Sequence, residues 1–106
     1  MQKLIITGNL GSDPEMRYTG NGVAVTNFSV AVTEKYTGAD GNKVEETTWY
    51  RVSAWRGQAE ACNRYLHKGS KVLVVGKLKS DIEVFQKRDG SHGASYEVTA
   101  KEIEFY

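Results

Sequence analysis

Apolar and polar positions alternate along much of this chain, dividing it into extended segments separated by turns. Residues 3–10 are rich in β-branched and apolar side chains and end in a Gly-Asn-Leu-Gly sequence, which predicts a strand leaving through a tight turn. Residues 23–33 form a second segment, in which Phe28, Val30 and Val32 alternate with polar or small residues. One buried face of a strand requires this period of two.

A third strand and a short helix are predicted next. Residues 37–43 contain glycine, aspartate and asparagine, which tolerate positive φ, so we expect a hairpin loop there before a strand at 47–55. After Gly57 the apolar positions recur at spacings of three and four, which indicates a short helix. Its expected core-facing residues are Ala59, Cys62, Tyr65 and Leu66.

Two more strands complete the pattern, at 71–79 and 95–105, separated by the polar, glycine-containing stretch 80–94. We interpret that stretch as a long loop, or as a hairpin of its own. Three strands, one helix and two strands is the order of the all-β OB-fold, a five-stranded barrel with one short helix between strands 3 and 4. An open α+β sheet remains an alternative at this point. We expect one domain over residues 1–106.

Composition narrows the cellular setting. No stretch approaches the roughly 18 apolar residues of a membrane span, and polar residues follow the first six too soon for a signal peptide, so we expect a cytoplasmic protein. Cys62 is the only cysteine, which excludes an internal disulfide and leaves no thiol partner for zinc. We expect Cys62 to act as a small buried apolar residue.

The charge is unevenly distributed, although the net charge is only +1. Six cations lie between residues 68 and 88 against two carboxylates, whereas residues 97–106 carry three glutamates and one lysine. The molecule is therefore predicted to have one basic side, which is what matters for a polyanionic ligand.

The third strand carries the most informative chemistry. Its alternation separates Trp49, Arg51, Ser53 and Trp55 from Tyr50, Val52 and Ala54. If the second group packs inward, two indoles about 20 Å apart flank a guanidinium on the outside. Unpaired bases stack on aromatic rings and phosphates bind cations, so this strip predicts sequence-independent binding of a nucleic-acid single strand. From the strip alone, the reverse orientation remains open.

Catalytic chemistry finds little support. His67 and His92 lack a cysteine or carboxylate at metal-ligand spacing, and the carboxylate pairs at 45–46 and 81–83 are typical of solvated charge. We therefore expect no enzyme, metal site or cofactor.

Several motifs resemble those of one family over residues 3–105. They are residues 8–18 (Gly-Asn-Leu-Gly-Ser-Asp-Pro-Glu-Met-Arg-Tyr), 21–22 (Asn-Gly), 27–29 (Asn-Phe-Ser), 45–51, 59–60 with 65–70, and 76–78. The family is that of bacterial-type single-stranded DNA-binding proteins. The resemblance implies an OB-fold that binds and protects single-stranded DNA in replication, recombination and repair, usually as a homotetramer on the nucleoid.

The resemblance also implies which side chains stack on bases. The family's positions fall on Tyr36, Trp49 and Trp55, and a fourth lies in the loop between strands 4 and 5, where Phe85 is the best candidate. The candidate phosphate contacts are Arg51, Arg56, Lys68, Lys71, Lys77, Lys79 and Lys87, with Arg17 and Lys35 as further candidates. Because Tyr36 and Phe85 offer smaller rings than tryptophan, we expect somewhat weaker binding per site.

One departure from the family pattern and two alternative functions remain. Family members usually continue into an acidic tail that recruits replication and repair proteins. The sequence stops at Tyr106 without such a tail, as expected either of a trimmed chain or of a short member of the family, which leaves partner recruitment open. The first rival is a primosome-type OB-fold module whose exposed aromatics bury against another protein. The second is a small OB-fold nuclease, for which the clustered carboxylates are not found.

Overall fold

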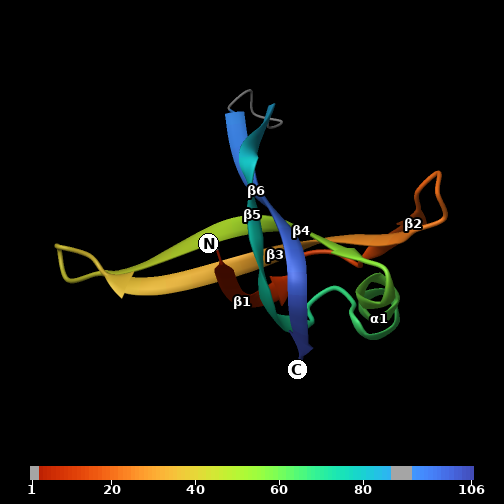
Figure 1. Cartoon of the computed structure of the whole chain (residues 1–106). Coiled ribbons are helices and arrows are strands. Elements are labelled where there is room, and N and C mark those ends of the chain that lie inside the picture. Colours follow the sequence, from red (N-terminus) through yellow and green to blue (C-terminus); the bar gives the residue numbers. More distant parts are fainter. Residues whose placement is uncertain (1–2, 87–91) are drawn as a thin grey trace.

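The computed structural model describes residues 3–86 and 92–106. In these two ranges the chain forms strands and one helix, with the following bounds: β1 (Leu4–Leu10), β2 (Glu15–Tyr18), β3 (Ala24–Thr37), β4 (Lys43–Trp55), α1 (Gly57–Tyr65), β5 (Lys71–Gln86) and β6 (His92–Phe105). Figure 1 shows β3 and β4 as one long ribbon crossed by the ribbon of β5 and β6.

Five of these strands close into a barrel. The sheet order is β1-β5-β6-β4-β3-β2, and a further pairing of β1 with β3, at Asn9↔Ala31 and Leu10↔Val30, joins the two ends of the five-stranded part. The pairing of β4 with β6 is parallel, and the other pairings are antiparallel. With α1 placed between β4 and β5, this is the predicted OB-fold barrel.

A short edge strand and two extensions differ from the predicted elements. Strand β2 pairs with β3 from Glu15↔Asn27 to Tyr18↔Ala24. It lies between the first two predicted strands, where no strand was predicted, because four residues are too few for alternation to be recognised. Of the two interpretations of residues 80–94, the hairpin is confirmed and the long loop is wrong: β5 continues to Gln86, β6 begins at His92, and the two strands pair with each other.

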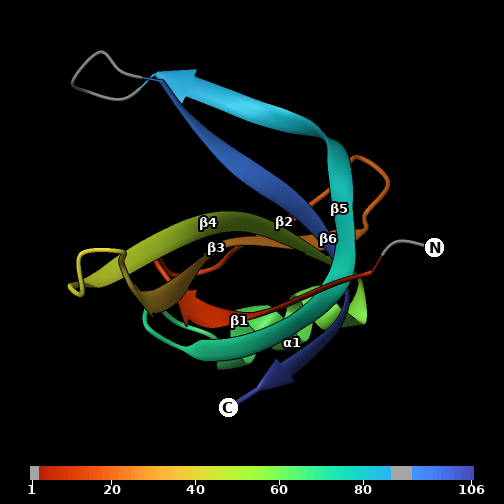
Figure 2. The ribbon, with the colours of Figure 1, turned by 90° about the vertical axis from the view of Figure 1, so that its left-hand side faces the viewer.

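Both long hairpins extend beyond the barrel, as Figure 2 shows. From Val32 to Thr37, β3 pairs with β4 alone, and from Ile82 to Gln86, β5 pairs with β6 alone. In the β3–β4 arm, the side chains of residues 33–37 and 43–47 are exposed, so the apolar alternation is lost there while the backbone ladder remains paired. That is why the sequence pattern ended β3 too early and began β4 too late.

The predicted loop at 37–43 is confirmed as the tight end of the β3–β4 arm. The Gly38 N–H donates to the Asn42 carbonyl oxygen at 2.8 Å, and Gly41 adopts a φ of 83°. The Asp40 carboxylate accepts hydrogen bonds from the backbone N–H and side-chain amide of Asn42 at 3.0 and 3.1 Å. These bonds lower the pKa of Asp40, because they favour its charged form.

The core lies inside the barrel and is covered at one end by α1. The barrel strands contribute Ile6, Leu10, Phe28, Val30, Val52, Ala54, Val72, Val74, Val98 and Ala100. Helix α1 contributes Ala59 and Cys62, and the Thr26 hydroxyl donates to the Ala59 carbonyl at 2.7 Å, which ties the helix to β3. Burial raises the pKa of Cys62 to about 11, so it is a neutral thiol, as expected of a small apolar residue.

The prediction that Tyr65 faces the core is wrong. Tyr65 is 60% exposed, and its ring packs at a tilt against Phe105, 5.9 Å between centroids. At about 100° per helical residue, Tyr65 lies about 120° around the axis from Ala59, beyond the edge of the buried stripe. Ala59, Cys62 and Leu66 are buried as predicted.

Candidate nucleic-acid interface

Strand β4 presents the two faces that its sequence predicts. Val52 and Ala54 are completely buried, and Tyr50 packs against the core beside them. On the opposite face Trp49 is 47% exposed and Trp55 42% exposed. The orientation left open by the strip alone is therefore resolved, with both indoles on the outside of the barrel.

Strand β3 widens this outer surface, because paired residues of antiparallel strands point to the same side. We call the resulting surface the tryptophan face, and its residues are the pairs Trp49 with Ala31, Arg51 with Ser29, Ser53 with Asn27, and Trp55 with Val25. The Ser53 hydroxyl donates to the Asn27 side-chain oxygen at 2.7 Å, which fixes two polar groups in its middle. The face thus combines two rings, a guanidinium and neutral hydrogen-bonding groups.

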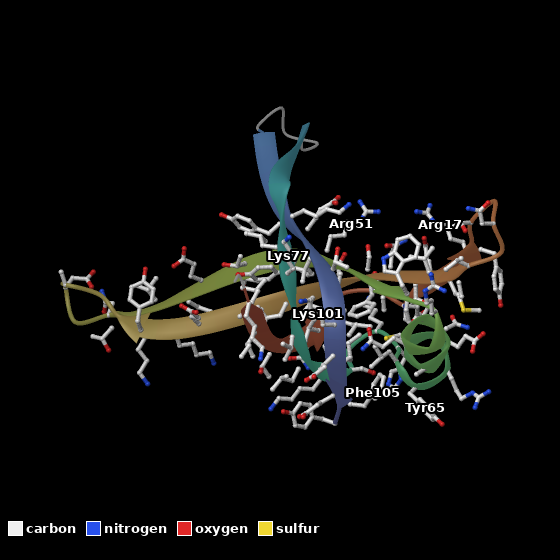
Figure 3. The ribbon with its side chains drawn as sticks, viewed as in Figure 1. Arg17, Arg51, Tyr65, Lys77, Lys101 and Phe105 are labelled. Atoms are coloured by element: carbon white, nitrogen blue, oxygen red, sulfur yellow. The ribbon has the colours of Figure 1, made fainter. Side chains whose placement is uncertain are left out.

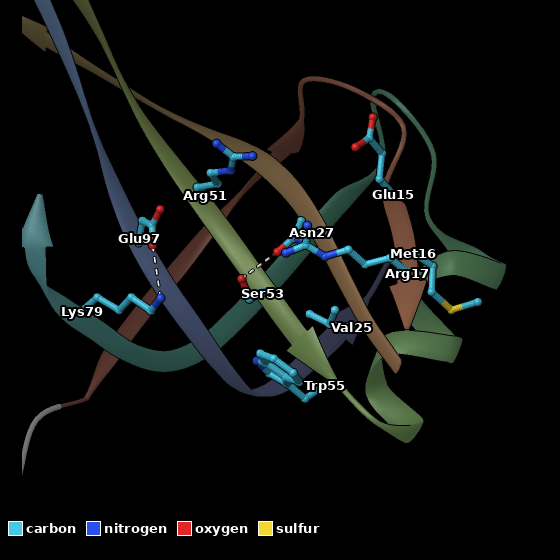
Figure 4. A pocket seen from close by; sticks show the side chains of 10 residues that line it. All are labelled: Glu15, Met16, Arg17, Val25, Asn27, Arg51, Ser53, Trp55, Lys79 and Glu97. Carbon is cyan, nitrogen blue, oxygen red and sulfur yellow. Dashed lines mark hydrogen bonds and ion pairs between the residues drawn. The ribbon is translucent and has the colours of Figure 1, made fainter. Parts of the chain in front are cut away.

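A depression of about 490 Å³ opens on the tryptophan face beside Trp55 (Figure 4). Edge strand β2 forms one wall, and β5 and β6 contribute the opposite side. The charged residues around it are Glu15, Arg17, Arg51, Lys79 and Glu97. Three cations beside an exposed indole give this hollow the chemistry of a phosphate-and-base site.

An ion pair already occupies part of this depression. The Lys79 ammonium lies 3.3 Å from a carboxylate oxygen of Glu97, and the register of β4 with β6 places Glu97 beside Arg51. Glu97 is therefore an anion positioned among the cations of the face. A phosphate that binds Lys79 must compete with it.

Only some of the predicted cations gather around the tryptophan face. Arg51 and Lys79 line the depression, and the exposed Lys77 pairs with Thr99, which in turn pairs with Ser53. Arg17 joins them because β2 pairs beside Val25, and Figure 3 shows Arg17 and Arg51 on one side of the β3–β4 ribbon, with Tyr65 and Phe105 on the other. Of the six cations at 68–88 that predicted a basic side, the structure places Lys77 and Lys79 near this face, while Arg17 and Arg51 come from other strands.

The remaining predicted cations lie elsewhere. Arg56 is exposed at the start of α1, with a φ of 61° and its N–H bonded to the Ala24 carbonyl oxygen at 2.8 Å. Lys68 lies in the loop after α1, where its backbone N–H donates to Asp13 at 2.8 Å. Lys71 begins β5 and places its ammonium 5.3 Å from the Tyr106 ring centroid. Lys87 falls outside the described residues.

Of the two other predicted stacking residues, only the side chain of Tyr36 is described, and it does not lie on the tryptophan face. Tyr36 is 51% exposed and pairs with Val44 near the tip of the β3–β4 arm. Five positions separate it from Ala31, and an odd separation places it on the other face of the ribbon. The backbone of Phe85 pairs with Gly93 in the β5–β6 arm, and its side chain lies outside the described part of the structure.

Sequence reasoning missed Asn27 and Glu97 on this surface and named Arg17 only as a further candidate. Asn27 was available from the alternation of the second strand, which also places it opposite Phe28. Arg17 received little weight because β2 was not foreseen. Glu97 could not be placed, since its position depends on the parallel pairing of β4 with β6, which local sequence does not signal.

Within residues 3–86 and 92–106, no three side chains of histidine, cysteine, aspartate or glutamate gather as a metal site would require. In the same ranges, no helix has the length and apolar composition to cross a membrane.

Comparison with known proteins gives this surface its context. The model of a family described as "Single-strand binding protein family" matches residues 1–106. A single-stranded DNA-binding protein of Neisseria meningitidis (serogroup A, strain Z2491) is 39% identical over 104 residues, covering 98% of this chain and 59% of that protein. Another from Xanthomonas axonopodis pv. citri is 38% identical, covering 98% of this chain and 57% of that protein.

A third relative, single-stranded DNA-binding protein 1 of Chlorobaculum tepidum, is 40% identical over 80 residues, which cover 76% of this chain and 49% of that protein. The chain thus spans about half to three fifths of the length of these curated relatives. The family match covers every residue of the chain, and the relatives agree with it. The chain belongs to the single-strand binding protein family.

Proposed function

We propose that this chain binds single-stranded DNA without regard to its base sequence. The observation that carries the proposal is the exposure of Trp49 and Trp55 on one face, with Arg51 between them. Every base has a π-face, so stacking on an indole is nearly indifferent to base identity, at about 1–3 kcal/mol per base. The names of the relatives, single-stranded DNA-binding proteins, support the same ligand.

Phosphates would be held by the cations around the depression. Arg17, Arg51, Lys77 and Lys79 are exposed near the rings, so a strand stacked on Trp55 brings its backbone within their reach. Their contacts release counterions, which makes affinity fall steeply with salt. For a strand that continues past this face, we propose the outlying cations as further contacts: Arg56, Lys68, Lys71 and Lys87.

Tyr36 and Phe85 would extend the path along the two arms. Because Tyr36 lies on the other face of the β3–β4 ribbon from Trp49, a strand that contacts both must pass around an edge of that ribbon. Beyond Val32 the described strands leave both edges of this arm without a further partner strand, which makes such a path sterically open. Phe85 remains a proposed fourth platform on the β5–β6 arm.

The wider role follows from the proposed ligand. We place this protein in DNA replication, recombination and repair, in the cytoplasm with the nucleoid, as a single OB-fold domain that assembles into a homotetramer. The homotetramer rests on the resemblance of the chain to its family. Recruitment of replication and repair proteins stays outside this proposal.

A fluorescence titration tests the function. Trp49 and Trp55 are the only tryptophans, so their emission reports on the proposed site directly. We expect strong quenching by oligo-dT, little by duplex DNA of equal length, and recovery as salt rises. Emission unchanged by oligo-dT would contradict the proposal and favour an interface with another protein.

Removing the Glu97 carboxylate should tighten binding. In Glu97→Gln, phosphate no longer competes with an anion for Lys79, so we expect about two- to fivefold higher affinity at low salt, shrinking as salt screens the charges. The measurement is a titration with labelled oligo-dT at several salt concentrations. Glu102→Gln is the matched control, on the same strand but beside Val75, away from the tryptophan face. Equal affinities of the two variants would show that Glu97 does not oppose phosphate.

A further inference from the structure

The indole of Trp49 lies against the backbone of Gly11. A Cβ atom added to Gly11 would be 2.5 Å from Cζ3 and 2.7 Å from Cη2 of that ring, far closer than the 3.5–4.0 Å at which carbon atoms pack. Only the missing side chain of Gly11 lets the ring occupy this position.

The backbone under the ring is firmly held. Gly11 follows the last residue of β1, and its N–H donates to the Ser29 carbonyl oxygen on β3 at 3.0 Å. The preceding Leu10 is buried and bonded through both its N–H and its carbonyl to the segment Gly69–Ser70, at 2.9 Å each. The indole therefore rests on a part of the barrel that cannot easily move.

Backbone conformation does not explain the glycine. Among the described glycines, positive φ occurs at Gly22, Gly41 and Gly69 and not at Gly11, so alanine could adopt the Gly11 backbone without strain. The atoms that a methyl group would meet belong to the far end of a side chain, not to the backbone. A substitution would accordingly displace the ring and leave the barrel intact.

We propose that Gly11 is a positioning residue that seats the Trp49 indole as a fixed platform for a stacked base. This inference rests on the proposed function and adds a residue that does not itself contact the ligand. Trp49 is 47% exposed, so the seat covers part of the ring and leaves the rest for a base. A ring fixed in advance loses less conformational freedom when a base stacks on it than a free ring does.

The test uses Gly11→Ala in a Trp55→Phe background, where Trp49 is the sole tryptophan. We expect its free-protein emission to shift and its quenching by acrylamide to rise, with oligo-dT affinity lowered about three- to tenfold. Gly20→Ala is the matched control, since a Cβ there meets no atom within 4 Å and no positive φ opposes it. The two variants should melt within about 4 °C of each other.

A double-mutant cycle separates seating from other effects. In a Trp49→Ala background the methyl group has room, so Gly11→Ala should no longer change the affinity. An equal loss of oligo-dT affinity with and without Trp49 would mean that Gly11 itself contacts the DNA. A markedly lower melting temperature of Gly11→Ala would mean that the barrel, and not the ring, is displaced. Either outcome overturns the proposal. If the parent binds oligo-dT but Gly11→Ala changes neither emission nor affinity, the positioning role of Gly11 is overturned and the proposed function is not. A parent that does not bind oligo-dT would overturn the proposed function.

Discussion

Trp55→Ala should weaken binding of oligo-dT by about 1–3 kcal/mol, which is roughly a 5- to 150-fold rise in Kd. Trp55 is half-exposed on the tryptophan face beside the depression, so truncation removes a stacking platform without opening the core. Anisotropy of a labelled oligonucleotide measures the affinity, and circular dichroism measures the melting temperature, which should stay nearly unchanged.

Tyr65→Ala is the matched control for this loss. Tyr65 is also an exposed aromatic, at 60%, but it lies on α1, on the other side of the β3–β4 ribbon from Arg51 (Figure 3). Its removal should leave affinity within about twofold. If Trp55→Ala unfolds the protein, or binds as tightly as the parent, the tryptophan face is not the stacking surface.

Gly8→Ala should lower the free energy of unfolding by about 3 kcal/mol or more. A Cβ at Gly8 would lie 2.3 Å from the Ala31 carbonyl oxygen and 2.8 Å from a Val30 methyl group, so it would force β1 away from β3. That contact joins the two ends of the barrel through only two residue pairs. We expect a fall in melting temperature of roughly 12–24 °C, measured by thermal denaturation.

The contrast with other glycines makes the Gly8 prediction specific. Gly20→Ala meets no atom within 4 Å and should leave the melting temperature almost unchanged, whereas Gly11→Ala meets only the movable end of a side chain. A Gly8→Ala protein as stable as Gly20→Ala would show that the β1–β3 contact tolerates a wider separation.

Strands that pack on the core could be predicted from sequence because burial imposes the alternation. Phe28, Val30 and Val52 are all buried, as an inward-facing alternation requires. The β3–β4 arm could not be predicted, because its exposed side chains have no core to face and its strands are held by backbone pairing, which composition does not record. The wrong prediction for Tyr65 has a related cause: the spacing of apolar residues does not determine which side chains of a short helix face the core.

The candidate site was predictable where it lies along one strand and not where it depends on several. Trp49, Arg51 and Trp55 follow from the alternation of β4. Arg17 and Glu97 reach the same surface through pairings between segments far apart in sequence, which no local pattern reveals. For the same reason, sequence did not reveal that Tyr36 and Trp49 occupy opposite sides of one ribbon.

The position of β6 affects how a newly made chain reaches its working form. In the sheet β6 lies between β5 and β4, although it follows both of them in the sequence and leaves the ribosome after them. Until it arrives, β4 and β5 each have one bare edge and α1 covers an unfinished barrel. Contacts between distant segments must then form late and slowly. Closure of the barrel during translation is therefore held back until β6 has emerged.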